Sequence, residues 1–162
     1  MTFLACLTGA ESVRSPDIAR VEKLVFEATN QFRRDQGVGP VEADARLGKA
    51  ARDFARYMAR TDKYGHDADG KQPADRARSH GYDYCVIAEN ISYQLNSAGF
   101  DAPELAGLYF EGWKRSPGHR RNMLDAEATD SAVAVARSDR TGRYYAVQMF
   151  ARPRSACMPR RG

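Results

Sequence analysis

A carboxylate, an indole and an imidazole lie within one fourteen-residue stretch, Glu111 to Leu124, of a chain that has three histidines in its 162 residues. The segment 101–104 predicts a capped helix start with a proline in the first turn, and the helix continues through Glu111. Ser116-Pro117 predicts the end of that helix and the start of another, with Ser116 as N-cap. His119 then falls in the first turn of the new helix. A glutamate and a histidine on either side of such a corner can converge to share a proton or bind a metal.

Two more residues of the same types fall beside breaks in the predicted elements. His66 follows Gly65, the predicted left-handed C-cap of a helix. The helix end therefore holds His66 in place, but His66 takes no part in the backbone hydrogen bonds of the helix. Glu89 lies in an apolar, β-branched run, where a carboxylate is costly to bury without a partner. It therefore either faces water on a strand edge or lines a polar site.

Imidazole and carboxylate groups are ligands for zinc and similar divalent ions. The four candidates are His66, Glu89, Glu111 and His119. Their residue types alone leave open whether they meet, because separate structural roles account for each of them as well.

Two other signals are interpreted as structural. His80 lies on a polar helix face beside Arg78 and is expected to be a solvated histidine. Asp67-Ala68-Asp69-Gly70 resembles the start of a calcium-binding loop, but the glutamate at the twelfth position is missing, so no calcium site is predicted.

The candidate residues need helices and strands to position them. Apolar spacing predicts a helix that starts at Ser15-Pro16-Asp17, with Ser15 as N-cap, and ends near Gln36. A second helix is predicted from Asp44 to Tyr64-Gly65, and a short one over 74–80. Strands are predicted over 86–93, 131–137 and 143–152, the last two joined by a hairpin turn at 138–142. This order predicts an α+β fold in which helices cover an antiparallel sheet.

Length and charge limit the classes of function. A chain of 162 residues is one domain by size, and its 28% charged and 43% hydrophobic residues are typical of a globular protein. The formal charge of +4 is compatible with an anionic partner, but basic residues are mixed with acids along the predicted helices, which favours a solvated surface. We therefore predict no nucleic-acid partner. No apolar run has the length of about 20 residues that a spanning helix requires.

Three cysteines, Cys6, Cys85 and Cys157, lack metal-finger spacing. Cys85 and Cys157 flank predicted strands, so a disulfide between them is one hypothesis for a chain outside the cytosol, and two separate thiols are the alternative. Residues 1–14 begin with an apolar stretch that ends in small residues, like part of an export signal, but without a basic start. Residues 154–162 are expected to form a basic, frayed tail.

The order of motifs resembles the CAP superfamily (cysteine-rich secretory proteins, antigen 5, pathogenesis-related 1) in its bacterial secreted form, also called the SCP-like domain. The resemblance covers roughly Ile18 to Pro153, and we assign residues 15–153 to this domain. The motifs that carry it are Asn30 with Arg33, His66, Gly81-Tyr82, Ala88-Glu89-Asn90-Ile91, Glu111-Gly112-Trp113, 116–124 and 145–150.

This resemblance implies a three-layer α-β-α sandwich with a central cleft. It also implies that His66, Glu89, Glu111 and His119 form a tetrad in the cleft, and that the two histidines can bind a divalent metal, with zinc the expected ion. Three further residues would support the cleft: Asn90, Ser116 and Gln148. The chain departs from bacterial relatives in the run 130–135, which has alanines where glycines are usual, and it has too few cysteines for the disulfide-rich branches.

Three functions are compatible with these features. The first is a secreted or periplasmic protein, or one attached to the cell surface, whose cleft binds a metal and a lipid, peptide or cell-wall ligand. The second is a metal-dependent hydrolase or peptidase with Glu89 or Glu111 as general base. The third is a non-catalytic structural role at the cell surface. Ser116 lies near His119, but its predicted use as a helix cap argues against a nucleophilic serine.

Overall fold

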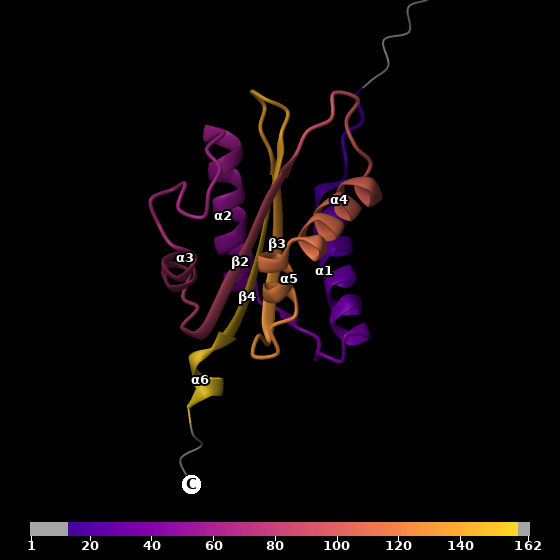
Figure 1. Cartoon of the computed structure of the whole chain (residues 1–162). Helices are drawn as coiled ribbons and strands as arrows, with labels where there is room; N and C mark the ends of the chain where they lie inside the picture. The colour runs from indigo at the N-terminus through magenta and orange to yellow at the C-terminus, as the bar shows by residue number, and fades with distance from the viewer. Residues whose placement is uncertain (1–12, 159–162) are drawn as a thin grey trace, which may run out of the picture.

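Four strands form a twisted sheet between two layers of helices in the computed structural model, which describes residues 13–158 (Figure 1). The strands are β1 (Glu42–Ala43), β2 (Tyr84–Gln94), β3 (Asp130–Arg137) and β4 (Tyr144–Pro153), in the spatial order β1-β3-β4-β2. β4 pairs in antiparallel fashion with both β2 and β3, and the two residues of β1 run parallel to β3. The α+β class is confirmed, and β1 is an addition that the sequence did not indicate.

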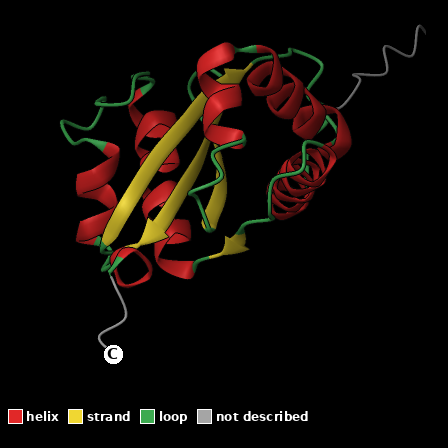
Figure 2. Ribbon diagram, turned by 60° about the horizontal axis from the view of Figure 1, so that its bottom comes forward, coloured by secondary structure: helices red, strands yellow, loops and turns green. Residues whose placement is uncertain are grey.

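Helices cover both faces of the sheet (Figure 2). On one face lie α2 (Ala45–Thr61) and α3 (Pro73–Ser79). On the other lie α1 (Ile18–Asp35), α4 (Ala102–Arg115) and α5 (Pro117–Met123). This arrangement confirms the expected three-layer sandwich. A short helix, α6 (Arg154–Cys157), follows β4.

The strands supply two apolar cores because successive side chains of a strand point to opposite faces of the sheet. In β4, Tyr145, Val147 and Met149 pack beneath α2. Tyr144, Ala146 and Phe150 pack toward α1 and α4 instead. The sheet is therefore buried on both faces, and its polar side chains are confined to the edges and to a few internal positions.

The three longest of the described helices start at aspartates. Asp44 and Asp101 cap α2 and α4 as predicted, and each accepts hydrogen bonds from backbone N–H groups of the first turn. The prediction for α1 is wrong by two residues: Asp17, not Ser15, is the N-cap, and its carboxylate accepts from the Arg20 N–H at 3.2 Å. A carboxylate stabilises the positive end of the helix dipole as well as accepting the hydrogen bond.

Helix α2 ends earlier than predicted. The sequence places its end at Tyr64-Gly65, but the last helical residue is Thr61, and Asp62 takes the left-handed conformation at φ 52°. The Asp62 side chain stabilises this ending because it accepts hydrogen bonds from Thr141 Oγ1 at 2.6 Å, Ser138 Oγ at 3.0 Å and the Tyr145 hydroxyl at 3.0 Å. Contacts to the distant β3–β4 hairpin therefore determine where the helix stops.

The outer edge of β2 is occupied by side chains from both layers. The Ile91 carbonyl accepts from Trp113 Nε1 at 3.2 Å and from the Tyr64 hydroxyl at 3.1 Å. The Glu89 carbonyl accepts from Asn122 Nδ2 at 3.3 Å. At the other side of the sheet, beyond the short β1, the Val135 N–H donates to Glu22 Oε1 at 2.9 Å.

A disulfide joins Cys85, near the start of β2, to Cys157 in α6, with a Cα–Cα distance of 6.4 Å. The proposed pairing of these cysteines is therefore confirmed, and the segment 154–157, expected to be frayed, is a helix attached to β2. Cys6 and nearly all of the export-signal-like segment lie outside the described residues. Within residues 13–158, no helix combines the length and the apolar character that a membrane span requires.

Candidate functional site

The candidate site is built around two consecutive residues of the edge strand β2. Glu89 is on the face that Ile91 shares with the α2 core, whereas Asn90 is on the opposite face with Gln148, its partner on β4. The strand therefore directs one polar side chain to the α2–α3 layer and the next to the α4–α5 layer. This explains how residues from both layers can belong to one site at the edge of the sheet.

On the α3 side, Glu89 is the centre of a buried ion pair. Its carboxylate is 1% exposed and contacts Arg76 Nη2 through both oxygens, at 3.0 and 2.9 Å. Arg76 also donates to Asp69 at 2.8 Å and to the His66 carbonyl at 2.7 Å, and its guanidinium lies 3.6 Å from the centre of the Phe54 ring. Glu89 thus lines a polar site, the second of the two alternatives derived from the sequence.

The same carboxylate orients His66. Glu89 Oε1 lies 2.9 Å from His66 Nδ1, and a carboxylate that is paired with an arginine can only accept a hydrogen bond. Nδ1 therefore carries a proton, and in the neutral form of the ring Nε2 has the lone pair. The imidazole is 49% exposed, so the lone pair is accessible from solvent. A histidine held by a carboxylate in this way is typical of metal ligands in proteins.

On the α5 side, Asn90 and Asn122 position His119. Asn90 Nδ2 donates to the His119 carbonyl at 3.2 Å, and Asn122 Nδ2 donates to Asn90 Oδ1 at 2.9 Å. Because Asn122 also contacts the Glu89 carbonyl, α5 is fixed against the backbone of β2 next to Glu89.

Burial lowers the pKa of His119, and the charge that His66 carries when it is protonated lowers it further. This influence places His66 within electrostatic range of His119, although the two residues come from opposite layers. A lowered pKa keeps His119 neutral at neutral pH, which is the form of imidazole that binds a metal.

Glu111 is less closely tied to the other three candidates. Its side chain is 45% exposed, and it forms an ion pair with Lys114 Nζ at 3.5 Å, one turn along α4. The predicted corner between α4 and α5 exists, with Ser116 as the shared cap, but Glu111 pairs with its own helix rather than with His119.

The three supporting residues have different environments. Asn90 is buried and belongs to the network just described. Ser116 is in the predicted N-cap position of α5, yet its hydroxyl makes no capping hydrogen bond. Gln148 is fully buried and donates to Thr29 Oγ1 of α1 at 3.0 Å, so it belongs to the interior between the sheet and α1.

Arg76 is the residue of this site that the sequence did not indicate. The one hint in the sequence is Glu89 itself, because a carboxylate in an apolar run needs a cationic partner if it is buried. The chain has 25 lysines and arginines, and nothing in the local pattern singles out Arg76 as that partner. The expectation for His80 is also wrong. Its ring is half-buried, with Nε2 2.9 Å from Asp53 Oδ2 and Nδ1 2.8 Å from the Arg76 carbonyl.

The donor set limits what the site can hold. Within residues 13–158, no three side chains among His, Cys, Asp and Glu come close enough together to bind one metal ion. The candidate donors of this region are the imidazoles of His66 and His119 and the carboxylate of Glu111, whose one ion pair, with Lys114, is 3.5 Å long. Catalytic zinc sites have three protein ligands and one open position, so two histidines alone are one ligand fewer, and water or a bound ligand would have to fill the remaining positions.

Comparisons with known proteins agree with the fold and the order of motifs. The model of the cysteine-rich secretory protein family, CAP, matches residues 26–150. The uncharacterized protein YkwD of Bacillus subtilis (strain 168) is 31% identical over 132 residues, which are 81% of this chain and 48% of the relative. This chain thus spans about half the length of that relative.

Two solved structures share the architecture. An outer surface protein of Borrelia burgdorferi superposes with a TM-score of 0.71 at 14% identity, and the match covers 82% of this chain and 92% of that one. An extracellular protein of Bacillus anthracis that contains an SCP domain has a TM-score of 0.67 at 23% identity, and the match covers 83% of this chain and 41% of that one.

Proposed function

Because the chain belongs to the cysteine-rich secretory protein (CAP) family, we propose that it is a secreted protein whose site at the edge of β2 binds a divalent metal and an extracellular ligand. The observation that carries this proposal is the contact between His66 and the buried Glu89 carboxylate. Arg76 fixes that carboxylate, so the orientation of the His66 ring, with Nδ1 bonded to Glu89, is set before any ion arrives. Such preorganisation raises metal affinity.

His66 and His119 are the proposed protein ligands, and zinc is the proposed ion, because neutral imidazoles suit zinc and the site offers no thiolate. The bound ion would supply a positive charge and open coordination positions. A lipid, peptide or cell-wall fragment with an oxygen donor would bind there, held by the residues around the two histidines. Secretion is supported by the disulfide, which persists in oxidising compartments, and by the extracellular SCP-domain protein of similar fold.

Thermal unfolding tests the metal. Zinc at about 100 times its dissociation constant should stabilise the protein by about 2.7 kcal/mol, which corresponds to a rise in Tm of roughly 5–10 °C for a domain of this size. The gain should be absent in His66→Ala/His119→Ala. It should also disappear near pH 5 in the wild type, because protonated imidazoles do not bind zinc.

His80→Ala is the matched control, since His80 is the third histidine and its ring contacts Asp53 and the Arg76 backbone carbonyl but neither proposed ligand. This variant should keep the full zinc effect. A wild type that zinc leaves unchanged at neutral pH, or a double variant that zinc still stabilises, would contradict the proposed ligands.

Glu111 favours a second function, a metal-dependent hydrolase or peptidase. Glu89 is engaged by Arg76 and His66, so it is poorly suited to accept a proton, whereas Glu111 is accessible and has one weak ion pair. As general base it would take a proton from a water molecule that attacks the substrate. A screen with peptides, esters and peptidoglycan fragments should show turnover that Glu111→Gln reduces at least about 100-fold, with the zinc-induced rise in Tm retained.

Glu104→Gln serves as the control for the loss of one carboxylate from α4, because Glu104 pairs with Arg14 at the far end of that helix. Turnover that survives in Glu111→Gln, or that falls equally in Glu104→Gln, would exclude Glu111 as the base.

A further inference from the structure

Helix α2 carries a surplus of positive charge. Its 17 residues contain five basic side chains and one acidic one, a surplus equal to the formal +4 of the whole chain. The expectation that basic residues are mixed with acids along the helices is therefore wrong for α2. Four of the basic residues lie on one stripe because their spacing of three, four and four residues keeps them on the same face of a helix. They are Lys49, Arg52, Arg56 and Arg60.

This stripe faces solvent. The opposite side of α2, with Leu47, Phe54 and Met58, is buried against the sheet, and all four stripe residues are exposed. Across residues 13–158, none of the four forms a salt bridge within 4 Å, whereas Arg46 on the same helix is paired with Asp44 at 2.7 Å. The four charges are therefore available to an external partner.

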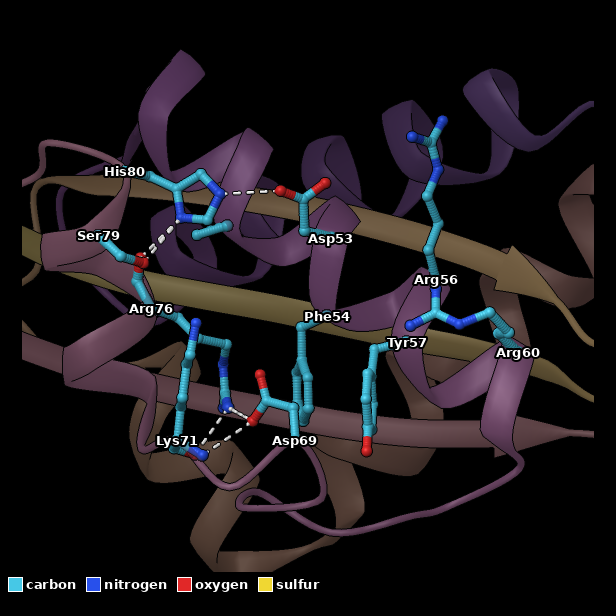
Figure 3. Close-up of a pocket in the computed structure, with 11 residues that line it drawn as sticks. Asp53, Phe54, Arg56, Tyr57, Arg60, Asp69, Lys71, Arg76, Ser79 and His80 are labelled. Carbon is cyan, nitrogen blue, oxygen red and sulfur yellow. Dashed lines mark hydrogen bonds and ion pairs between the residues drawn. The ribbon is translucent and has the colours of Figure 1, made fainter.

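Two hollows lie beside the stripe. One, of about 450 Å³, lies between α2 and the β3–β4 hairpin and is lined by Arg56, Arg60, Arg137 and Arg140. The other, of about 460 Å³, lies between α2 and α3 and includes Arg56, Arg60 and Lys71 (Figure 3). Because Arg56 and Arg60 border both, the two hollows form a track that crosses the helix at these residues.

The acids near this track are mostly engaged. Asp53 contacts His80, and Asp69 contacts the buried Arg76, as the dashed lines in Figure 3 show. Asp139 is fully exposed at the hairpin and lies 3.7 Å from Arg137. Glu22 is half-buried, accepts from the Val135 N–H and lies within electrostatic range of Arg52 and Arg56, so it offsets part of their charge. The surplus of positive charge at the track therefore remains.

We propose that the stripe Lys49, Arg52, Arg56 and Arg60, with the two flanking hollows, binds a flexible linear polyanion whose repeating groups are phosphates or sulfates. Arginine side chains bind such tetrahedral oxyanions through paired N–H donors. Arg52, Arg56 and Arg60 follow one another at about 6 Å along the helix, so an extended chain can contact them in succession. This surface is separate from the histidine site and does not depend on it.

A membrane surface and a nucleic acid fit the same face less well. The large hydrophobic side chains that are exposed in residues 13–158 all belong to other segments, so α2 has no apolar residue to insert into a bilayer. The two phenyl-type rings that line the track are both covered: Phe54 is buried under the Arg76 guanidinium, and Tyr57 is half-buried and lies under the Arg60 guanidinium at 5.5 Å, so bases find neither ring free for stacking.

Binding of long-chain inorganic polyphosphate and of heparin to the full chain tests this inference, measured at about 50 and 150 mM salt. Arg56→Gln/Arg60→Gln should weaken the binding of whichever polymer is preferred by about tenfold or more at the lower salt. It should also make the slope of log K against log salt less steep by about 1.4, which is two contacts at about 0.7 each. Preference for polyphosphate or for heparin would identify phosphate or sulfate as the recognised group.

Arg20→Gln/Arg34→Gln is the matched control, because it removes the same charge from α1 on the other face of the sheet. The control should change affinity less than about threefold. The inference would be overturned if neither polymer binds at low salt, or if the two double variants weaken binding equally. It would also be overturned if single-stranded DNA of equal charge binds more tightly than both polymers, or if anionic vesicles bind while both polymers do not.

Discussion

Arg76 shows how one buried charge can organise a site without contacting a ligand. Its side chain is 3% exposed, yet it contacts two carboxylates, Asp69 and Glu89, and two backbone carbonyls. The ion pair with Arg76 holds the buried Glu89 carboxylate beside His66 and keeps it from turning toward solvent. Without it, the Glu89 carboxylate would be buried without a cationic partner, and His66 would lose its fixed orientation.

The stability of the protein should therefore depend strongly on Arg76. Arg76→Met leaves the Glu89 carboxylate buried without its partner, and we expect the free energy of unfolding to fall by about 3–5 kcal/mol in urea denaturation. Arg78→Met, which removes an exposed arginine from the same helix, should change it by less than about 1 kcal/mol.

A second substitution separates the charge effect from lost packing. Arg76→Met/Glu89→Gln removes the unpaired charge as well, so the double variant should be more stable than Arg76→Met alone. If the double variant is no more stable than Arg76→Met, the cost of losing Arg76 comes from its contacts with Phe54 and the loop, and the unpaired charge of Glu89 contributes little.

At the scale of elements, Asp62 links the end of α2 to the β3–β4 hairpin. The hydrogen bonds from Thr141, Ser138 and Tyr145, together with the nearby Arg140 guanidinium, hold the pKa of the Asp62 carboxyl below its usual value. The folded state therefore releases this proton more readily than the unfolded chain does. This contribution to stability is fully present above the usual pKa of 3.8 and is lost as the pH falls through the lower, folded pKa.

Asp62→Asn tests this link without disturbing the backbone, since asparagine also adopts the left-handed conformation. The variant should be less stable than the wild type near neutral pH, and the difference should shrink as the pH falls from about 5 to about 2. Urea denaturation across this range measures it. Asp139→Asn, at the exposed tip of the same hairpin, should leave the pH dependence unchanged; an equal effect there would show that hairpin charge in general is responsible.

The elements also show which local signals in the sequence are reliable. Asp44 and Asp101 can be predicted as N-caps because the capping hydrogen bond is made within four residues of chain. The end of α2 is misplaced because Gly65 is the better local candidate, while the groups that stop the helix at Asp62 come from residues 138–145. Pattern reasoning finds the endings that are encoded locally and misses those that depend on tertiary contacts.

For the whole molecule, the fold depends mainly on patterns that are local in the sequence, whereas the site depends on contacts between distant segments. Alternating apolar residues in the strands and apolar stripes on the helices determine the layers, and both are visible in the sequence. The four site candidates follow from residue type and motif order, and the structure joins His66 to Glu89 while leaving Glu111 on Lys114. Arg76 could not be found, because its role depends on α3 lying against β2, a contact between segments that no local pattern specifies.

The side chains that occupy the outer edge of β2 have a consequence for recognition. A peptide can bind to many proteins by β-strand addition, in which its backbone extends a sheet through the unpaired groups of an edge strand. Here the carbonyls of Glu89 and Ile91 are already bonded to Asn122, Tyr64 and Trp113. A peptide ligand of this site must therefore be selected by its side chains or its terminal carboxylate, and its sequence, rather than its capacity to form a strand, would determine whether it binds.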